Sequence, residues 1–315
     1  MLRLVMRHLA GSVGLLVAVS MTGFTLLRLA PGGPLAQFAL APGMTQERLQ
    51  TIAHQMGLDQ PLGMQYLRWL GGIVMGDWGR SYRDQQPVTH VIATHLGATT
   101  ELVAIVILIS FPIGAALGLW GALTTARIVD RIISVFSMVC YSAPTFWIGL
   151  VLVYVFSIRF GLLPAGGMVS PGASSFMDRV RHLVLPVSVL VTVMVPVWCR
   201  YMRAFAEDVL RHDYIRTGLA MGLPAWRVYG RHVLGNAMLP MISVLGTQVP
   251  ALLGGTLVTE TVFIWPGIGR LFLDSLQYRD YPVVMGILMA SAICVIVAAV
   301  IAETCYRSID SRLAL

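Results

Sequence analysis

The segment DYIRTGLAMGLPAWRVYGRHVLGNAMLP, Asp213–Pro240, decides how this chain is organised. It is polar, rich in arginine and compatible with helix, and it separates two long apolar stretches. Gly222 and Pro224 stand near its centre and predict a tight turn between two short helices. Two membrane helices can be joined by a few residues, so a connection of this length indicates a structured surface for a soluble partner.

Composition places the chain among membrane proteins. Hydrophobic residues make up 57% of the 315 and charged residues 12%, with a mean hydropathy of +0.76. Soluble domains carry about 25% charged residues. Crossing a bilayer takes about 20 residues of helix, and continuous apolar runs exclude the alternating strands of a β-barrel. Six spans are predicted: Leu9–Leu27, Leu102–Leu123, Ile132–Ile158, Leu183–Phe205, Leu239–Val262 and Val283–Ala302.

These spans predict an all-α polytopic membrane protein with one transmembrane domain over residues 1–315. A large outer loop covers about residues 31–100, and a cytoplasmic loop covers about 206–238. Within the outer loop, Thr45 is expected to begin a helix. Arg3 and Arg7 precede the first span, whose apolar core is too long for a signal peptide, so we expect a retained helix.

The net charge of +7 comes entirely from arginine, since the chain contains no lysine. The arginines gather in short connections on one side of the predicted spans, as the positive-inside rule requires. Six spans place both termini on that same side, so both termini are predicted to be cytoplasmic. Because topology explains the charge, nucleic acid is not expected as a partner.

Several motifs resemble one family of bacterial permeases, in the same order and at about the same spacing. They are GLDQP (Gly57–Pro61), QYLRWL (Gln65–Leu70), GDWGRS (Gly76–Ser81), PTFWIGL (Pro144–Leu150), ETVFIWPGIGRLFLDSLQYRDYPVV (Glu260–Val284) and SIDSRL (Ser308–Leu313). The family is that of the ABC importer permeases for peptides and nickel, of the dipeptide/oligopeptide permease B type. The likeness runs from Leu2 to Leu313. The central loop departs from the EAA pattern of other importers, because Arg216-Thr217-Gly218 stands where EAA would lie.

The resemblance implies the type I ABC importer permease fold and the transport of di- or oligopeptides across the bacterial inner membrane. The implied partners are a second related permease, two ATPase subunits and an external substrate-binding protein, beside the lipid bilayer. No cofactor is expected on this chain, with ATP and Mg²⁺ on the ATPases. A nickel, metallophore or glutathione importer of the same family is the alternative. A stand-alone secondary transporter or channel would show an internal repeat and a mid-membrane site, and the sequence shows neither.

The central loop is expected to be the knob that couples ATP hydrolysis to transport. Its apolar side chains would fill a cleft on the ATPase, and its arginines would meet acidic groups at the rim. The alternative is an amphipathic helix lying on anionic lipid, which the Gly–Leu–Pro break disfavours. The expected coupling residues are Asp213, Tyr214, Ile215, Arg216, Thr217, Leu219, Met221, Gly222, Leu223, Arg227 and Arg231.

On the outer side, the loops Pro31–Thr100 and Trp265–Pro282 are expected to dock the substrate-binding protein. For the first loop, packing on the bilayer and the bundle is the alternative. Glu101 and Glu260 lie near span ends, where they would line an outer vestibule or pair with arginine, because ionisable groups inside a membrane are costly unless paired or hydrated. The expected outer contact residues are Arg83, Glu101, Glu260, Trp265 and Gln277.

The sequence contains no catalytic motif. It has no GxxxxGK[ST] phosphate loop, no HExxH and no GxSxG, so the chain is not expected to be an enzyme. Cys140, Cys199, Cys294 and Cys305 lack ligand spacing and are interpreted as packing residues, not as a metal site. Small residues are expected to allow close helix contacts, at Gly114 and Gly118 and at Gly254 and Gly255.

Overall fold

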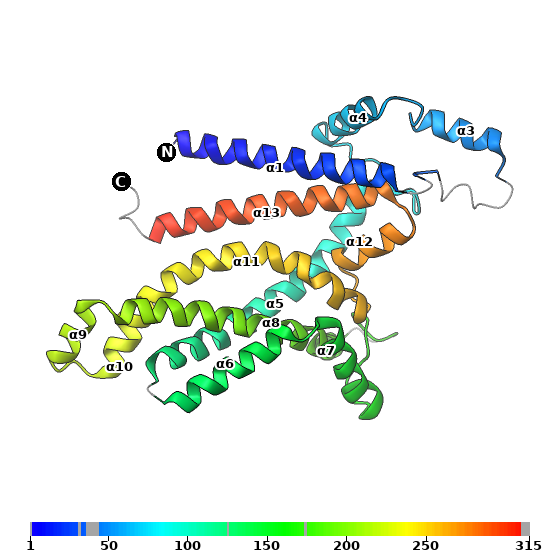
Figure 1. Cartoon of the computed structure of the whole chain (residues 1–315). Coiled ribbons are helices and arrows are strands. Elements are labelled where there is room, and N and C mark those ends of the chain that lie inside the picture. The colour runs from blue at the N-terminus through cyan, green and yellow to red at the C-terminus, as the bar shows by residue number, and fades with distance from the viewer. Residues whose placement is uncertain (1, 31–32, 36–43, 125, 173–174, 310–315) are drawn as a thin grey trace. The chain divides into compact units, whose positions relative to one another are not determined.

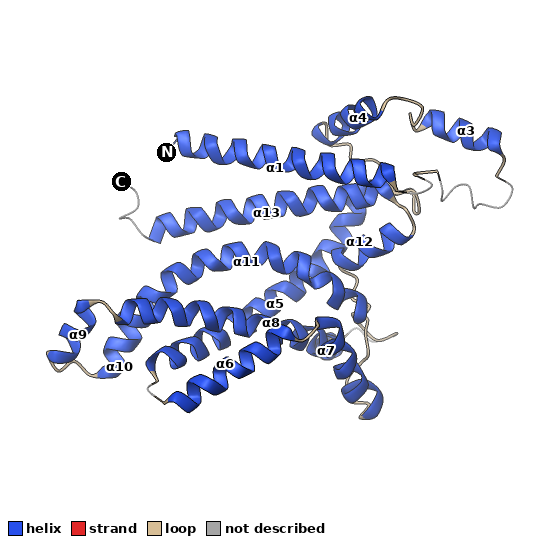
Figure 2. Cartoon of the chain, viewed as in Figure 1, coloured by secondary structure: helices blue, strands red, loops and turns tan. Residues whose placement is uncertain are grey.

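A computed structural model describes residues 2–30, 33–35, 44–124, 126–172 and 175–309, and within these residues every regular element is a helix (Figures 1 and 2). The only pairing of extended backbone in the same ranges is an isolated bridge between Arg80 and Pro87. The chain divides into two compact units. The first comprises Met1–Ala98 and Gly267–Ile296, and the second comprises Thr99–Pro266 and Val297–Leu315.

The first unit packs long helices through glycine. Its elements are α1 (Leu2–Leu29), α3 (Gln46–Gln55), α4 (Leu62–Val74), the start of α5 (Val88–Leu123), α12 (Ile268–Gln277) and the start of α13 (Tyr281–Ile309). A Cβ atom at Gly23 of α1 would lie 2.8 Å from Cδ1 of Leu288, and one at Gly286 of α13 would overlap Val88. The overlap at Gly286 makes that contact depend on glycine, whereas the end of the Leu288 side chain could shift to admit a Cβ at Gly23.

The second unit contains the remaining helices: the rest of α5, α6 (Arg127–Ser142), α7 (Thr145–Leu152), the π-helix η1 (Val153–Arg159), α8 (Phe176–Leu210), α9 (Asp213–Ala220), α10 (Ala225–Arg227), η2 (Val228–Val233) and α11 (Leu234–Val262). Its core centres on Trp198 of α8, which is fully buried. The indole Nε1 of Trp198 donates to Oγ of Ser110 on α5 at 3.0 Å, and the ring of Phe111 meets it edge-on.

Glycine brings α5 and α8 together, as predicted for Gly114 and Gly118. A Cβ atom at Gly114 would lie 2.8 Å from the carbonyl oxygen of Val195. One at Gly118 would overlap the carbonyl oxygen of Cys199 and lie 2.9 Å from Cβ of Met202. Gly254 and Gly255 do not make the corresponding predicted contact with any residue that the structure describes, because no atom of those residues lies within 4 Å of a Cβ placed at either.

Six membrane spans are accounted for if each bent helix pair counts as one. Four helices are long and apolar enough alone: α1, α5, α8 and α13. The fifth is α6 followed by α7 and η1, bent by 93°, and the sixth runs from Ala225 to Val262 with a bend of 60°. Pro144 precedes α7 at its N-cap position, where a missing N–H costs no helical hydrogen bond, and so marks the first bend.

Both large loops are shorter than predicted, because the flanking helices are longer. Helix α5 begins at Val88, so the predicted outer loop over 31–100 ends thirteen residues early. In the central loop, residues 206–210 belong to α8 and residues 234–238 to α11. Thr45 does begin a helix, since its Oγ1 accepts the N–H of Arg48 at 3.4 Å.

Candidate functional site

The central loop folds into two short helices joined by a left-handed turn. Figure 1 shows α9 and α10 at one end of the α8–α11 pair. Gly222 has φ +82°, and the turn is closed by the N–H of Gly222 bonded to Leu219 O and the N–H of Leu223 bonded to Gly218 O. The predicted helix–turn–helix is confirmed, with Pro224 one position before the second helix instead of inside it.

This loop, Arg211–Val233, is called the knob below, and its buried side chains continue the core of the second unit that contains Trp198 and Met202. Ile215 is 2% exposed, and it belongs to one buried cluster with Val228 and Val233. Leu223 packs against the same cluster. Ile215 is therefore not available to fill a cleft on a partner in this structure, which corrects that expectation, whereas Leu223 is half-buried and its expected contact stays a prediction.

The exposed face of the knob is apolar and aromatic. Met221, just before Gly222 in the chain, is 72% exposed, and Trp226, after it, is 71% exposed. Tyr214 and Leu219 are also exposed. The phenol of Tyr214 accepts a hydrogen bond from Nδ2 of Asn236 at 3.1 Å, which fixes α9 against the start of α11. Exposed large apolar side chains on a rigid turn are typical of a protein–protein contact.

The knob also carries exposed charged side chains. Arg216, Arg227 and Arg231 are exposed, as is Arg211 at the end of α8. None of the four forms an ion pair with a residue that the structure describes. The guanidinium of Arg227 lies 5.4 Å from the ring centroid of Trp226. Asp213 lies in the first turn of α9, where a carboxylate is stabilised by the helix dipole, and Thr217 Oγ1 bonds back to the Asp213 carbonyl.

Trp226 is the functional candidate that the sequence analysis missed. It lies between Pro224 and Arg227 in a polar segment, and a tryptophan so placed has no apolar span to enter. The sequence therefore contained a signal for Trp226. Only the fold shows that Trp226 is exposed while the nearby Val228 is buried.

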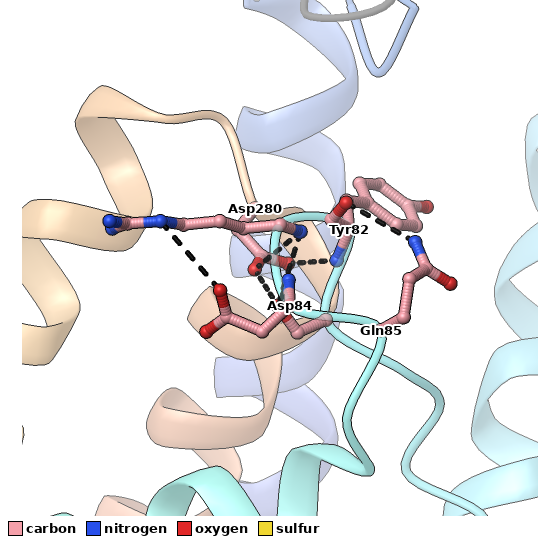
Figure 3. A network of polar contacts seen from close by, with 6 residues as sticks. Tyr82, Asp84, Gln85 and Asp280 are labelled. Carbon is pink, nitrogen blue, oxygen red and sulfur yellow. Dashed lines mark hydrogen bonds and ion pairs between the residues drawn. The ribbon is translucent and has the colours of Figure 1, made fainter.

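A second candidate surface lies in the first unit and is held by one carboxylate (Figure 3). Asp280 is 3% exposed and closes the loop at residues 81–84. Its Oδ2 accepts the hydroxyl of Ser81 at 2.5 Å, and its Oδ1 accepts the N–H of Tyr82 at 2.9 Å. The hydroxyl oxygen of Ser81 in turn accepts the N–H groups of Arg83 and Asp84.

This network presents Arg83, one of the expected outer contact residues. Its guanidinium lies 4.2 Å from the ring centroid of Tyr278, a cation–π distance. Gln277, the last residue of α12, is exposed beside Tyr278 in the sequence. The structure thus brings Arg83 close to the α12 end that carries Gln277.

The other three expected outer residues belong to the second unit. Glu101 forms an ion pair with Arg179 of α8, whose Nε donates to Oε1 at 2.8 Å, so the predicted pairing with arginine is confirmed. Glu260 is fully buried and accepts the hydroxyl of Thr99 at 2.8 Å, and Trp265 is fully buried as well. Neither Glu260 nor Trp265 offers a side chain to a partner in this structure, which corrects that expectation.

The potential metal ligands whose side chains the structure describes do not gather into a site. Among the residues that the structure describes, no group of three or more His, Cys, Asp and Glu side chains could hold a metal ion. Cys140 and Cys199 are buried free thiols, and Cys294 is free and half-buried. Cys305 lies outside the residues whose side chains are described.

These features define a multi-pass membrane permease. The chain belongs to the family of binding-protein-dependent transport system inner membrane components, whose family description matches residues 110–315 and whose N-terminal description matches residues 1–117. It is therefore an ABC transporter permease of the bacterial inner membrane, a class of subunit that is typically non-catalytic.

Its relatives match over nearly the whole chain. A putative peptide permease protein of Brucella suis biovar 1 (strain 1330) is 37% identical over 99% of both chains. The oligopeptide transport system permease protein AppB of Bacillus subtilis (strain 168) is 35% identical over 98% of both. The dipeptide transport system permease protein DppB of Escherichia coli (strain K12) is 32% identical over 99% of both.

Two solved structures share the fold. One is an amino acid ABC transporter crystallised with histidines, with a TM-score of 0.55, 15% identity and coverage of 70% of this chain and 94% of that one. The other is the MetNI methionine ABC transporter in inward-facing conformations, with a TM-score of 0.52, 15% identity and coverage of 71% and 96%. The type I ABC importer permease fold predicted from the sequence is thereby confirmed.

Proposed function

We propose that this permease carries di- and oligopeptides across the inner membrane as one of two transmembrane subunits of an ATP-driven importer. The relatives named above are a peptide, an oligopeptide and a dipeptide permease, and none of them is named for nickel or glutathione. Its partners would be a second related permease, two ATPase subunits carrying ATP and Mg²⁺, and an external substrate-binding protein. The chain would act as a single transmembrane domain.

One observation carries the coupling role: the knob offers an exposed apolar face among arginines that have no acidic partner among the described residues. Trp226 and Met221 would enter a cleft on the ATPase, and Arg216, Arg227 and Arg231 would meet acidic groups around it. Aromatic and arginine side chains dominate binding energy at such interfaces. Complementary charge at the rim raises the association rate and suppresses wrong partners.

The outer docking role would fall to the surface that carries Arg83 and Gln277. Asp280 fixes the loop, and the fixed loop presents the Arg83 guanidinium over Tyr278. A surface already rigid loses little conformational entropy on binding. This assignment places the knob in the cytoplasm with both termini, and Arg83 on the opposite side.

Reconstitution of the complete importer tests the proposal. The permease is co-expressed with its neighbouring transporter subunits, purified and placed in proteoliposomes, and ATP hydrolysis is measured with peptide-loaded binding protein. Peptides of two to five residues are expected to stimulate hydrolysis. Stimulation by a nickel chelate and by no peptide would refute the substrate class.

A matched pair of tryptophans tests the coupling surface. Trp226→Ala is expected to leave the melting temperature unchanged and to weaken ATPase binding about 30-fold, equivalent to a hot spot of roughly 2 kcal/mol. Trp147→Ala, at a 56% exposed tryptophan in α7, removes the same side chain outside the knob and is expected to leave ATPase binding unchanged. Equal binding by both variants would contradict the role of the knob.

A further inference from the structure

A cavity of about 650 Å³ lies within the first unit at the end of α1. Side chains from α1, from α4, from the segment at residues 77–85 and from the start of α13 line it. Three arginines face this space, Arg28, Arg68 and Arg80, against a single aspartate, Asp77. Asp77 is already engaged, because its Oδ1 accepts the N–H of Gly79 at 3.0 Å. The lining therefore carries an excess of positive charge.

Arg28 is the deepest of these cations. It is half-buried, and its guanidinium lies 5.1 Å from the ring centroid of Phe24. No ion pair joins Arg28, Arg68 or Arg80 to a carboxylate within the part of the chain that the structure describes. A half-buried guanidinium without a carboxylate is costly, and an anion in the cavity would offset that cost.

Neutral hydrogen-bonding groups accompany the arginines. Burial raises the pKa of the Tyr82 phenol to about 12, so this hydroxyl stays protonated at physiological pH. Phe24 of α1 and Trp69 of α4 contribute aromatic rings to the lining, and Tyr66, which is not itself a lining residue, packs against both rings. The lining thus combines cations and hydroxyls with an aromatic wall.

The position of the cavity decides which anion is available. Arg28 is one residue from Leu29, where the apolar span Gly11–Leu29 ends. Helix α4, which supplies Arg68 and Trp69, exposes the large apolar side chains Leu62, Met64, Leu67 and Val74. Such a helix is stable when its apolar face enters the lipid interface. Tryptophan and tyrosine are enriched at the same level of a membrane.

We propose that this cavity is a binding site for the phosphate headgroup of an anionic phospholipid in the leaflet where α1 ends. The phosphodiester would lie between the guanidinium groups of Arg28 and Arg68, with Arg80 at the side. Arginine suits this role because its planar donors match phosphate oxygens in pairs. The lipid would add to the direct contacts between α4 and α1, in which Phe24 packs on Tyr66 and Trp69. The site is separate from the knob and does not depend on which substrate is carried.

A lipid titration of the purified full-length permease tests this site. The protein is kept in a neutral detergent, and its melting temperature is followed while dioctanoyl phosphatidylglycerol is added. Dioctanoyl phosphatidylcholine and soluble glycerol phosphate serve as parallel titrants. Phosphatidylglycerol is expected to raise the melting temperature in a saturable way. Neither of the other two titrants is expected to do so in the same concentration range.

Arginine variants identify the site. Arg28→Gln and Arg68→Gln are each expected to raise the half-saturating concentration of phosphatidylglycerol about tenfold or more, since a hydrogen bond to a charged group is lost. Arg83→Gln is the control: it removes one arginine charge from the loop at residues 77–85 of the same unit, at a position outside the cavity lining, and it is expected to titrate like the wild type. Circular dichroism confirms that each variant is folded.

Three results would overturn the proposal. An equal rise in the half-saturating concentration of phosphatidylglycerol for Arg83→Gln would show that general surface charge attracts the lipid. Full retention of binding in Arg28→Gln would remove the cavity from the interaction. A melting shift with glycerol phosphate that matches or exceeds the shift with phosphatidylglycerol would assign the cavity to a soluble anion.

Discussion

The hydroxyl of Ser81 and the carboxylate of Asp280 meet at 2.5 Å although 199 positions separate them in the chain. Both groups are almost completely buried. Asp280 also accepts the backbone N–H of Tyr82, so one side chain closes the loop at residues 81–84 against the turn between α12 and α13. The surface around Arg83 consequently depends on a residue that is itself out of reach of solvent.

Replacing this carboxylate should loosen the loop. Asp280→Asn keeps the size but removes the charge and one acceptor, and we expect a loss of about 2 kcal/mol in the free energy of unfolding. Hydrogen exchange at the amides of residues 82–84 should accelerate by at least tenfold. Asp84→Asn removes the same charge from an exposed carboxylate that lies 3.8 Å from Arg83, and it should change neither quantity. An unchanged exchange rate in Asp280→Asn would show that Asp280 does not hold the loop at residues 81–84.

The left-handed turn of the knob predicts a different outcome for two glycines. Gly222→Ala places a Cβ on a residue with φ +82° and should cost about 1 kcal/mol, although no atom lies within 4 Å of that Cβ. Gly230→Ala, in η2 and equally free of neighbours, should be neutral or slightly stabilising. Thermal unfolding of the purified chain compares them.

A bulky residue at the same turn tests the knob as a contact surface. Gly222→Trp should abolish ATPase binding while the membrane helices remain folded, because the added ring stands on the exposed face. Co-purification with the ATPase subunits measures binding, and circular dichroism measures folding. Wild-type assembly together with wild-type peptide uptake in Gly222→Trp would refute the coupling role.

The contact between α5 and α8 should depend on Gly118. Gly118→Ala brings a Cβ into overlap with the carbonyl oxygen of Cys199, which must move, and we expect a destabilisation of about 1–3 kcal/mol. Gly97→Ala lies on the same helix with nothing within 4 Å and should stabilise by a few tenths to about 1 kcal/mol. The two melting temperatures should therefore move in opposite directions. A melting temperature that rises for Gly118→Ala as it does for Gly97→Ala would mean that α5 and α8 separate without cost.

Sidedness can be read from two exposed positions. Asp84→Cys should react in intact cells with a thiol reagent that cannot cross the membrane, and Met221→Cys, expressed without ATPase subunits, should react only after permeabilisation. The expectation follows from the arginines of the short connections, which favour the cytoplasm. The reverse pattern of labelling would invert the topology.

Local features of the chain were predictable from the sequence. The positive φ of Gly222 followed from a glycine just before Leu223-Pro224, and the spans followed from apolar runs of sufficient length. The predicted ends of the spans were less accurate. Helix α5 begins at Val88, before the predicted start at Leu102, and its first residues include polar ones that hydropathy alone assigns to a loop. Backbone hydrogen bonding continues a helix beyond its apolar core, and hydropathy does not register this.

Features that depend on the tertiary fold were not predictable. Ile215 and Met221 are both apolar residues of the same loop, yet one is 2% exposed and the other 72%. Which of them faces a partner depends on the packing of α9 against η2. The π-helix η1 and the contact between Ser81 and Asp280 have no local sequence signal either. A single sequence shows which residues are apolar or charged, and only packing shows which of them are free to bind.

Helix α8 is continuous over 35 residues, with Arg179 in its first turn and the knob beginning directly after Leu210. At 1.5 Å per residue it is a strut of about 50 Å, so a tilt of about 5° around one end displaces the other by roughly 4 Å. The ion pair to Glu101 lies at one end of this strut and the exposed turn at the other. Pro186 and Pro196 each remove a hydrogen bond inside α8, so a displacement of the knob would be shared between tilting of the helix and bending at these prolines before it reached the ion pair at the other end.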